Sequence, residues 1–230
     1  MISWLYKKIG EFLKDAVYAA NDGVITTFAV VAGVVGASLD PIVILVLGFA
    51  NLFADGISMA SGNYLGTKSE KGLYSKERER NRRLLREDKE KYKKRISAFL
   101  ESKGYADSDL RGLAELITHN EKFALDFMMH EEIGLVEQEE ARPLKGAMVT
   151  LAAFMLAGLV PLVPYIFFTA SANAFLYASI FTAIALFGIG AARSIFTEKS
   201  WFSSGLEMFL VGGLAAVVAY GIGFGVSRII

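Results

Sequence analysis

Five long stretches of almost uninterrupted apolar residues dominate this sequence of 230 residues. A helix that crosses the hydrocarbon core of a bilayer needs about 20 predominantly apolar residues. The five stretches approach or exceed that length, at approximately residues 16–39, 42–65, 146–168, 172–196 and 204–227. Because hydrocarbon cannot hydrogen-bond to the backbone, we expect each stretch to form a transmembrane helix. The sequence therefore predicts an all-α, polytopic membrane protein with five transmembrane helices.

Most of the charged residues lie between the second and third apolar stretches, although the formal net charge of the chain is zero. This pattern predicts a water-exposed insert of three helices. Its first helix, 69–100, is expected to continue from the second span, because the run contains strong helix formers and no Pro. The other two are expected at about 107–119 and 121–133. The expected domains are 1–67 (an amphipathic N-terminal helix and spans one and two), 68–142 (the insert) and 143–230 (spans three to five).

The distribution of basic residues predicts the orientation of the chain. The segment 1–16 is amphipathic and lacks the features of a secretory signal, so we expect a helix on the membrane surface. Lys and Arg near span ends are retained in the cytoplasm. The basic segments are the N-terminus, the insert and the loop containing Arg193 and Lys199. We therefore expect a cytoplasmic N-terminus and insert and a C-terminus on the far side, in either a cell membrane or a vacuole-like organelle membrane.

Two carboxylates lie inside the expected spans. Asp22 and Asp55 are the only acidic or basic residues in the first and second apolar stretches. An unpaired carboxylate in hydrocarbon costs about 2.5–3.5 kcal/mol, so such residues are functional candidates by default. The alternative is a structural role, in which the carboxylates would bond to polar neighbours. Those neighbours are Asn21, Thr26, Thr27 and Ser58.

Residues with amide, carboxylate or thioether groups recur at four-residue intervals along the second span, which places them on one helix face. They are Asn51, Asp55, Met59 and Asn63. Counting from the cytoplasmic ends of the spans puts Met59 at the depth of Asp22, with Asp55 one turn deeper. A carboxylate with a thioether suits Fe²⁺ or a neighbouring transition metal better than Mg²⁺ or Ca²⁺. The expected pathway residues are Asp22, Met59, Asp55 and Asn51, with Asp15 at the cytoplasmic mouth.

The expected third insert helix carries a second candidate metal set. Met128 and Glu132 share one face, with Met129 adjacent, although paired Met residues also serve as core. The chain has no Cys, which excludes thiolate sites and disulfides. It also lacks GxSxG, GxxxxGK[ST] and HExxH motifs, so we expect neither an enzyme nor a nucleic-acid-binding protein.

Five segments carry a recognisable pattern: ANDGVITT (20–27), GFANLFADGISMASGNYL (48–65), KSEK (68–71), DFMMHEEIGL (126–135) and PLVPY (161–165). Together they resemble the vacuolar iron transporter family over nearly the whole chain. The resemblance implies a homodimer of five-span subunits that exchanges cytoplasmic Fe²⁺, and often Mn²⁺, for protons, with no permanently bound cofactor. It also implies a pathway between the two first spans, with Asp22 and Met59 as metal ligands.

The resemblance further implies a cytoplasmic metal-binding insert with glutamates on its first helix and a Met-Met…Glu set on its third. Met128, Met129 and Glu132 match that third-helix set. At the positions expected for the glutamates stand Asn81, Leu84, Tyr92 and Arg95, and the available substitutes are Glu77, Glu87 and Glu90. The stretch 76–95 contains eleven basic and five acidic residues. Such a balance repels divalent cations and is equally suited to anionic lipid headgroups.

We therefore expect a homodimeric, proton-coupled transporter that moves Fe²⁺, or Mn²⁺ or a related divalent transition metal, out of the cytoplasm. Fe²⁺ is then the substrate and H⁺ the coupling ion. One alternative is a transporter of a different cation. Another is a non-transporting membrane protein whose basic insert binds lipid or a partner.

Overall fold

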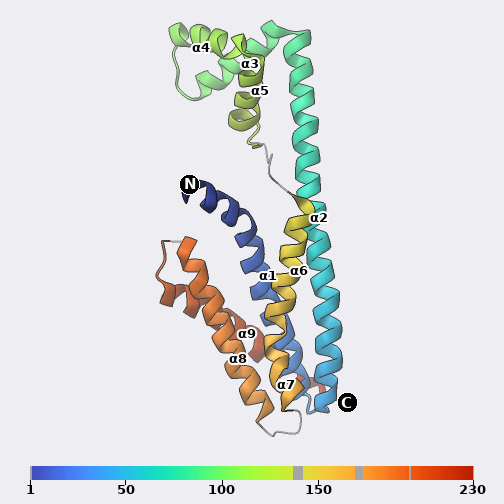
Figure 1. The fold of residues 1–230 in the computed structure, drawn as a ribbon. Helices are drawn as coiled ribbons and strands as arrows, with labels where there is room; N and C mark the ends of the chain where they lie inside the picture. The colour runs from blue at the N-terminus through green and yellow to red at the C-terminus, as the bar shows by residue number, and fades with distance from the viewer. Residues whose placement is uncertain (1, 137–141, 169–172, 197, 230) are drawn as a thin grey trace. The chain divides into compact units, whose positions relative to one another are not determined.

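The computed structural model describes residues 2–136, 142–168, 173–196 and 198–229, and every regular element within them is a helix (Figure 1). Five segments are long and apolar enough to cross a membrane. They belong to α1 (Ile2–Gly36), α2 (Pro41–Glu87), α6 with η2 and α7 (Pro143–Phe167), α8 (Ala174–Arg193) and α9 (Trp201–Val226). The predicted all-α architecture with five spans is confirmed. Side chains 2–11 lie outside the described residues, so the amphipathic surface expected there stays a prediction.

The third span is not one regular helix. It consists of α6 (Pro143–Gly158), one turn of 3₁₀ helix, η2 (Val160–Leu162), and α7 (Val163–Phe167). Pro161 and Pro164 have no backbone N–H, so the regular hydrogen-bond ladder is interrupted there and the helix changes pitch. The expected start of the fourth span at residue 172 lies outside the described residues, and α8 begins at Ala174. A short 3₁₀ segment, η3 (Ser194–Phe196), follows α8.

The chain divides into two compact units, the first comprising residues 1–64 with 142–230 and the second residues 65–141. In the first unit, helices α1 and α6 run in the same direction. Asp15 near the start of α1 lies beside Gly146 near the start of α6, and Gly23 lies beside Phe154 further along. Helix α2 runs the opposite way. Its early Gly48 lies against Leu162, beyond the end of α6, whereas its later Asn63 is bonded to Asp15, beside the start of α6.

The last two spans continue this alternation of directions. Gly33 of α1 touches Gly223 of α9, so these two helices are parallel. Gly190 late in α8 touches Ser204 early in α9, so these two are antiparallel. Helices α1, α6 and α9 therefore run one way through the unit and α2 and α8 the other, as the ribbon shows (Figure 1).

Helices α1 and α6 approach one another so closely that their backbones touch. A Cβ atom on Gly23 would lie 2.5 Å from the carbonyl oxygen of Phe154, and one on Gly158 would lie 2.9 Å from the carbonyl oxygen of Gly23. Only glycine fits at such a crossing, which is why small residues gather where membrane helices meet. Gly23 directly follows Asp22, so this crossing fixes the position of that carboxylate.

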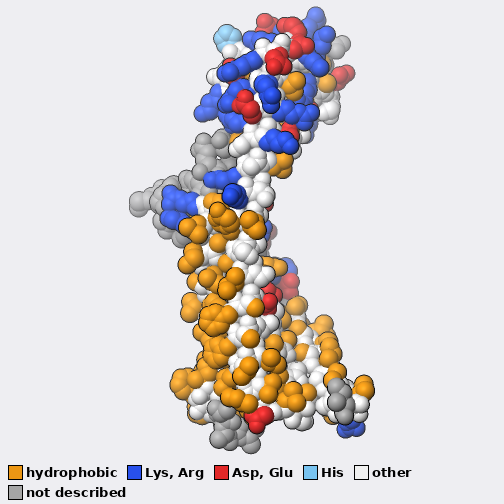
Figure 2. Space-filling view, turned by 90° about the vertical axis from the view of Figure 1, so that its right-hand side faces the viewer, with side chains coloured by type: hydrophobic (Ala, Val, Ile, Leu, Met, Phe, Trp, Pro, Cys, Tyr) orange, Lys and Arg blue, Asp and Glu red, His pale blue; other side chains and the backbone are white. Residues whose placement is uncertain are grey.

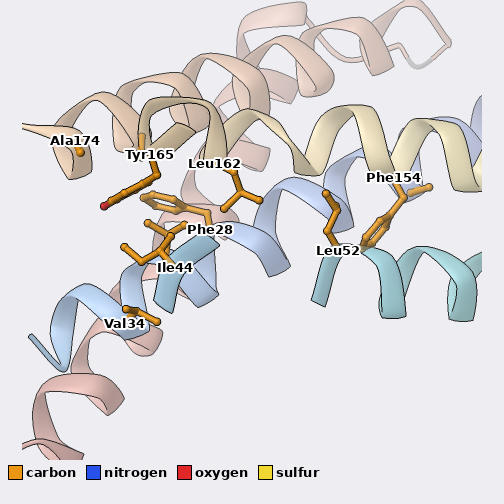
Figure 3. Close-up of a cluster of buried hydrophobic side chains, with 11 residues drawn as sticks. Phe28, Val34, Ile44, Leu52, Phe154, Leu162, Tyr165 and Ala174 are labelled. Carbon is orange, nitrogen blue, oxygen red and sulfur yellow. The ribbon is translucent and has the colours of Figure 1, made fainter. Parts of the chain in front are cut away.

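A buried apolar cluster joins these helices (Figure 3). Leu52 of α2, Phe154 of α6 and Leu162 of η2 are completely buried. Phe28 of α1 stacks on Phe175 of α8, with ring centroids 6.1 Å apart. The face of the unit that Figure 2 shows is mainly apolar, which fits a lipid environment.

The second unit is a small helical domain with a charged surface (Figure 2). It contains the end of α2, then α3 (Lys89–Ser102), α4 (Asp107–His119), α5 (Glu121–Phe127) and a π-helical turn, η1 (Met128–Glu132). The expected single helix 69–100 is wrong at Asp88. The Asp88 backbone is not helical, and its side chain accepts a hydrogen bond of 2.9 Å from the Lys91 backbone N–H, which starts a new helix.

The core of this unit comes from one face of each helix. On α3, Tyr92, Ile96 and Leu100 recur every four residues and are all buried. They pack in one cluster with residues of α2, α4, α5 and η1, which are Leu85, Leu110, Ala114, Ile117, Ala124, Leu125 and Met128. The insert therefore has its own hydrophobic core.

Candidate functional site

Asp22 and Asp55, the acidic residues of the first two apolar stretches, lie near one another. Asp22 of α1 and Asp55 of α2 are both half-buried, and their carboxyl groups are close enough to interact electrostatically. Among the residues that the structure describes, neither carboxylate accepts a hydrogen bond or forms an ion pair. The Thr26 hydroxyl, an expected partner, instead donates to the Asp22 backbone carbonyl at 2.9 Å. Within the described residues, no side-chain hydrogen bond of the kind that the structural alternative predicts joins Asn21, Thr26, Thr27 or Ser58 to either carboxylate.

Buried polar atoms on α1, α2 and α6 also lack partners within the described part of the chain. They are Asn21 Oδ1 and Thr27 Oγ1 on α1, Asn51 Nδ2 on α2 and Thr150 Oγ1 on α6. Burying a polar group without a hydrogen bond costs roughly 1–3 kcal/mol in proteins. Helices α1, α2 and α6 therefore carry buried polar atoms in addition to the two carboxylates, although similar atoms occur on α8 and α9, at Thr182 Oγ1 and Ser204 Oγ.

Asp15 and Asn63 form the next polar contact toward the start of α1. The Asn63 amide donates to Asp15 Oδ2 at 2.9 Å. Gly146 of α6 is directly beside them, since a Cβ atom there would lie 2.8 Å from Asn63 Oδ1. Three helices therefore meet at this point, with Asp15 held in place by an amide.

This hydrogen bond sets the register of α1 against α2 and corrects the expected depths. Asp22 is seven residues beyond Asp15, so in an antiparallel pair it faces the region seven residues before Asn63, where Asp55 and Gly56 lie. The electrostatic interaction between Asp22 and Asp55 agrees with this register. Met59 is then about one turn closer to Asp15, not level with Asp22. It packs against the buried apolar cluster of this unit.

We expect Asn63→Ala to lower the free energy of unfolding by about 1–2 kcal/mol, because it removes a hydrogen bond to a charged group between two helices. Denaturation of the purified protein in mixed micelles measures this change. Ser61→Ala is the matched control, since the exposed Ser61 hydroxyl donates within its own helix, to the Ser58 carbonyl, and to no other group of the described residues. Equal stability of the two variants would contradict the role given to Asn63.

Glu207 is an acidic residue of the fifth span that the sequence analysis missed. It lies in the second turn of α9 and pairs with Lys199 at 3.0 Å and with Arg193 at 3.8 Å. The sequence contained a signal for this ion pair, because Arg193 and Lys199 lie just before the acidic residue of that span. Glu207 therefore differs from Asp22 and Asp55 in having cationic partners.

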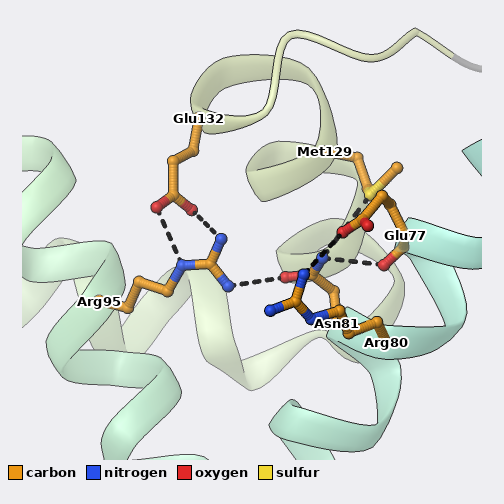
Figure 4. A network of polar contacts seen from close by, with 6 residues as sticks. All are labelled: Glu77, Arg80, Asn81, Arg95, Met129 and Glu132. Atoms are coloured by element: carbon orange, nitrogen blue, oxygen red, sulfur yellow. Dashed lines mark hydrogen bonds and ion pairs between the residues drawn. The ribbon is translucent and has the colours of Figure 1, made fainter.

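The insert brings together several of the residues expected in its metal set (Figure 4). Met128 and Met129 are buried, at 0% and 1% exposure, and the Met129 sulfur is 4.0 Å from Asn81 Nδ2. Glu132 is paired with Arg95. In the part of the chain that the structure describes, no three His, Asp or Glu side chains are grouped as metal ligands.

Of the four positions at which the family resemblance leads one to expect glutamates, Leu84 and Tyr92 are part of the insert core. Leu84 packs against the buried cluster, and Tyr92 belongs to it. The pKa of Tyr92 is raised to about 12, chiefly by burial, while Arg95 lowers it and Glu132 raises it. The phenol is therefore neutral at physiological pH and offers no anionic ligand.

These features define a class of protein, a five-span α-helical membrane protein with a carboxylate pair inside its spans and a separately packed helical insert. Residues 13–224 match the sequence profile of the VIT family, and the chain belongs to that family. This confirms the resemblance identified from the sequence.

Curated relatives match over nearly the full chain. Vacuolar iron transporter 1 of Eucalyptus grandis is 32% identical over 212 residues, which cover 92% of this chain and 85% of that protein. The vacuolar iron transporter of Toxoplasma gondii is 32% identical over 222 residues, covering 93% and 74%. Vacuolar iron transporter 1 of Arabidopsis thaliana is 30% identical over 211 residues, covering 92% and 84%.

Proposed function

We propose that this chain carries Fe²⁺ across a membrane, out of the cytoplasm, in exchange for protons. The observation that carries the proposal is the pair of carboxylates, Asp22 and Asp55, which lie close together in apolar spans without a cationic partner among the described residues. Membership of the VIT family supports a metal ion as substrate, because the relatives are named vacuolar iron transporters. Fe²⁺ is the substrate and not a resident cofactor, and we assign no catalytic residue.

Competition for the carboxylate pair supplies the coupling. Two neighbouring carboxylates repel one another when both are ionised, and either a proton or a divalent cation relieves that repulsion. A site that binds one excludes the other, so metal leaves when protons arrive from the far side. Asp22 is the principal ligand in this scheme, Asp55 assists it, and the Asn51 amide lies one turn from Asp55.

Met59 and Asp15 mark the cytoplasmic part of the proposed route. Asp15 attracts the cation, and the Met59 thioether, between Asp15 and Asp22 in the register of the helices, offers a soft ligand that favours Fe²⁺ or Mn²⁺ over Ca²⁺. The scheme places a ligand at roughly each helical turn. Such spacing lets an ion pass between sites without losing all of its ligands.

The proposed orientation of the chain rests on the basic residues and the alternating helix directions. Helices α1 and α9 run in the same direction, so the ends of the membrane unit fall on opposite sides. The basic N-terminus and insert then belong in the cytoplasm, and the C-terminus on the far side. We further propose that two copies of the chain form the functional transporter, as the family resemblance implies.

Flux through liposomes tests this function. Purified protein is reconstituted in vesicles that contain a dye quenched by Fe²⁺, and the metal is supplied outside under anaerobic conditions. We expect uptake that accelerates several-fold when the vesicle interior is acidic, together with proton release reported by a pH-sensitive dye. Mn²⁺ added outside should compete with Fe²⁺ and slow the quenching of the dye. Absence of flux would overturn the transport proposal, and flux indifferent to pH would overturn the exchange mechanism.

A further inference from the structure

In the insert, the guanidinium of Arg95 contacts two other helical segments (Figure 4). Arg95 of α3 donates from Nε to Glu132 Oε1 at 2.9 Å, and its terminal nitrogen lies 2.8 Å from Glu132 Oε2. Its other terminal nitrogen donates to Asn81 Oδ1 of α2 at 2.9 Å. This bidentate pair with an additional bond is a strong form of charge-assisted contact.

Asn81 is the buried end of this network. It is 1% exposed, and its amide donates to the Glu77 backbone carbonyl at 2.9 Å and points toward the Met129 sulfur at 4.0 Å. The Asn81 oxygen is already bonded to Arg95. Both polar atoms of this side chain are therefore engaged, and none is left to coordinate a metal.

The acidic groups around η1 are likewise paired with cationic or polar neighbours. Asp126 lies 2.8 Å from an Arg78 nitrogen, and Glu131 lies 2.9 Å from His130 Nδ1. Glu132 is bound through both oxygens to Arg95. A divalent cation would have to displace a guanidinium before it could reach these carboxylates, against the repulsion of that same charge.

We propose that the Arg95 guanidinium fills the position that a divalent cation would take between α2, α3 and η1. The three segments are then joined by this side chain and need no bound metal. The thioether of Met129 and the carboxylate of Glu132 are then parts of a structural contact and not metal ligands. This departs from the metal role expected for Met128, Met129 and Glu132. The inference does not depend on whether the membrane unit transports Fe²⁺.

Removing the guanidinium should expose a latent metal site. In Arg95→Gln the Glu132 carboxylate loses its cation, and the Asn81 oxygen and the Met129 sulfur remain nearby. An oxygen and thioether set of this kind suits Mn²⁺ or Fe²⁺ better than Ca²⁺. The variant should therefore respond to a metal that leaves the natural insert unaffected.

Hydrogen–deuterium exchange of the full chain in detergent, with and without Mn²⁺, measures this response segment by segment. For the natural chain we expect no change on adding Mn²⁺ in the peptides that cover 76–102 and 121–135. In Arg95→Gln, exchange at η1 should be about tenfold faster without metal, because a charge-assisted contact is lost. Mn²⁺ should restore most of the protection.

Arg86→Gln is the matched control, because Arg86 forms a similar pair with Glu121 in the same unit but is more exposed, at 65% against 35% for Arg95. It should leave exchange at η1 unchanged with and without Mn²⁺. The same comparison in Asp22→Asn separates insert binding from metal in the spans. Metal-induced protection of η1 in the natural chain would overturn the proposal, whether or not Arg95→Gln folds. Equal exchange at η1 in folded Arg95→Gln and Arg86→Gln, with and without Mn²⁺, would overturn it too.

Discussion

Asp22→Asn is expected to lower Fe²⁺ flux by about 100-fold. Replacing residues that merely orient metal ligands already costs up to about 100-fold, and Asp22 is itself a proposed ligand. The amide keeps the shape of the side chain and removes its charge, so it can neither attract a divalent cation nor exchange a proton. Asp55 remains in this variant, but one carboxylate in place of two leaves the site with half of its negative charge. Initial rates of quenching in proteoliposomes measure the loss.

The stability of the same variant separates a transport role from a structural one. The described residues provide no hydrogen bond or ion pair to Asp22 or Asp55, and the two carboxyl groups interact with one another. Removing one of two neighbouring charges should therefore leave the free energy of unfolding unchanged or raise it. Lost flux with retained stability is the signature of a residue kept for function.

Asp40→Asn is the control for this experiment. Asp40 lies in the loop between α1 and α2, where its exposed carboxylate accepts a hydrogen bond of 2.8 Å from the Ile42 backbone N–H. An Asn oxygen can accept the same bond, so both flux and stability should stay close to those of the natural chain. Flux in Asp22→Asn equal to that in Asp40→Asn would exclude the proposed role of Asp22.

The spans could be predicted from the sequence because the bilayer imposes a length and an apolar composition that few other structures satisfy. The Asp22 and Asp55 candidates followed from the same rule, since a carboxylate is conspicuous in an apolar stretch. Their relative depth did not follow. It depends on the register of α1 against α2, which the hydrogen bond between Asp15 and Asn63 sets and which counting from span ends leaves uncertain by about one turn.

The insert was harder to predict because its key features depend on tertiary contacts. Asp88 stands in a run of strong helix formers, and a helix could have continued through it. It starts a new helix instead, and α3 places Tyr92 and Ile96 against the core of the unit. In the same way, Arg95 looked in the sequence like a mismatch, because it stands where the family resemblance implies a glutamate. Only the fold places it between Asn81 and Glu132.

Gly223→Ala is expected to destabilise the membrane unit by about 3 kcal/mol, at the upper end of the usual cost of overpacking. A Cβ atom at this position would overlap the backbone of α1, where the nearest atoms are the Gly33 carbonyl group and the Ala37 nitrogen. Backbone atoms cannot rotate away as a side chain does, so α9 would have to move away from α1. Denaturation in mixed micelles and the folded yield on gel filtration measure the effect.

The neighbouring glycines of α9 provide controls in the same helix. Cβ atoms on Gly221 and Gly225 would meet no atom of the described residues within 4 Å. Gly221→Ala and Gly225→Ala should therefore be neutral, or stabilising by up to about 1 kcal/mol, because Ala favours the helix over Gly. If a second copy of the chain packs on that face, these two variants would instead weaken the dimer while the monomer stays folded. Destabilisation by Gly223→Ala that is no greater than that by its neighbours would contradict the close contact between α1 and α9, and with it the parallel arrangement that places the two ends of the unit on opposite sides.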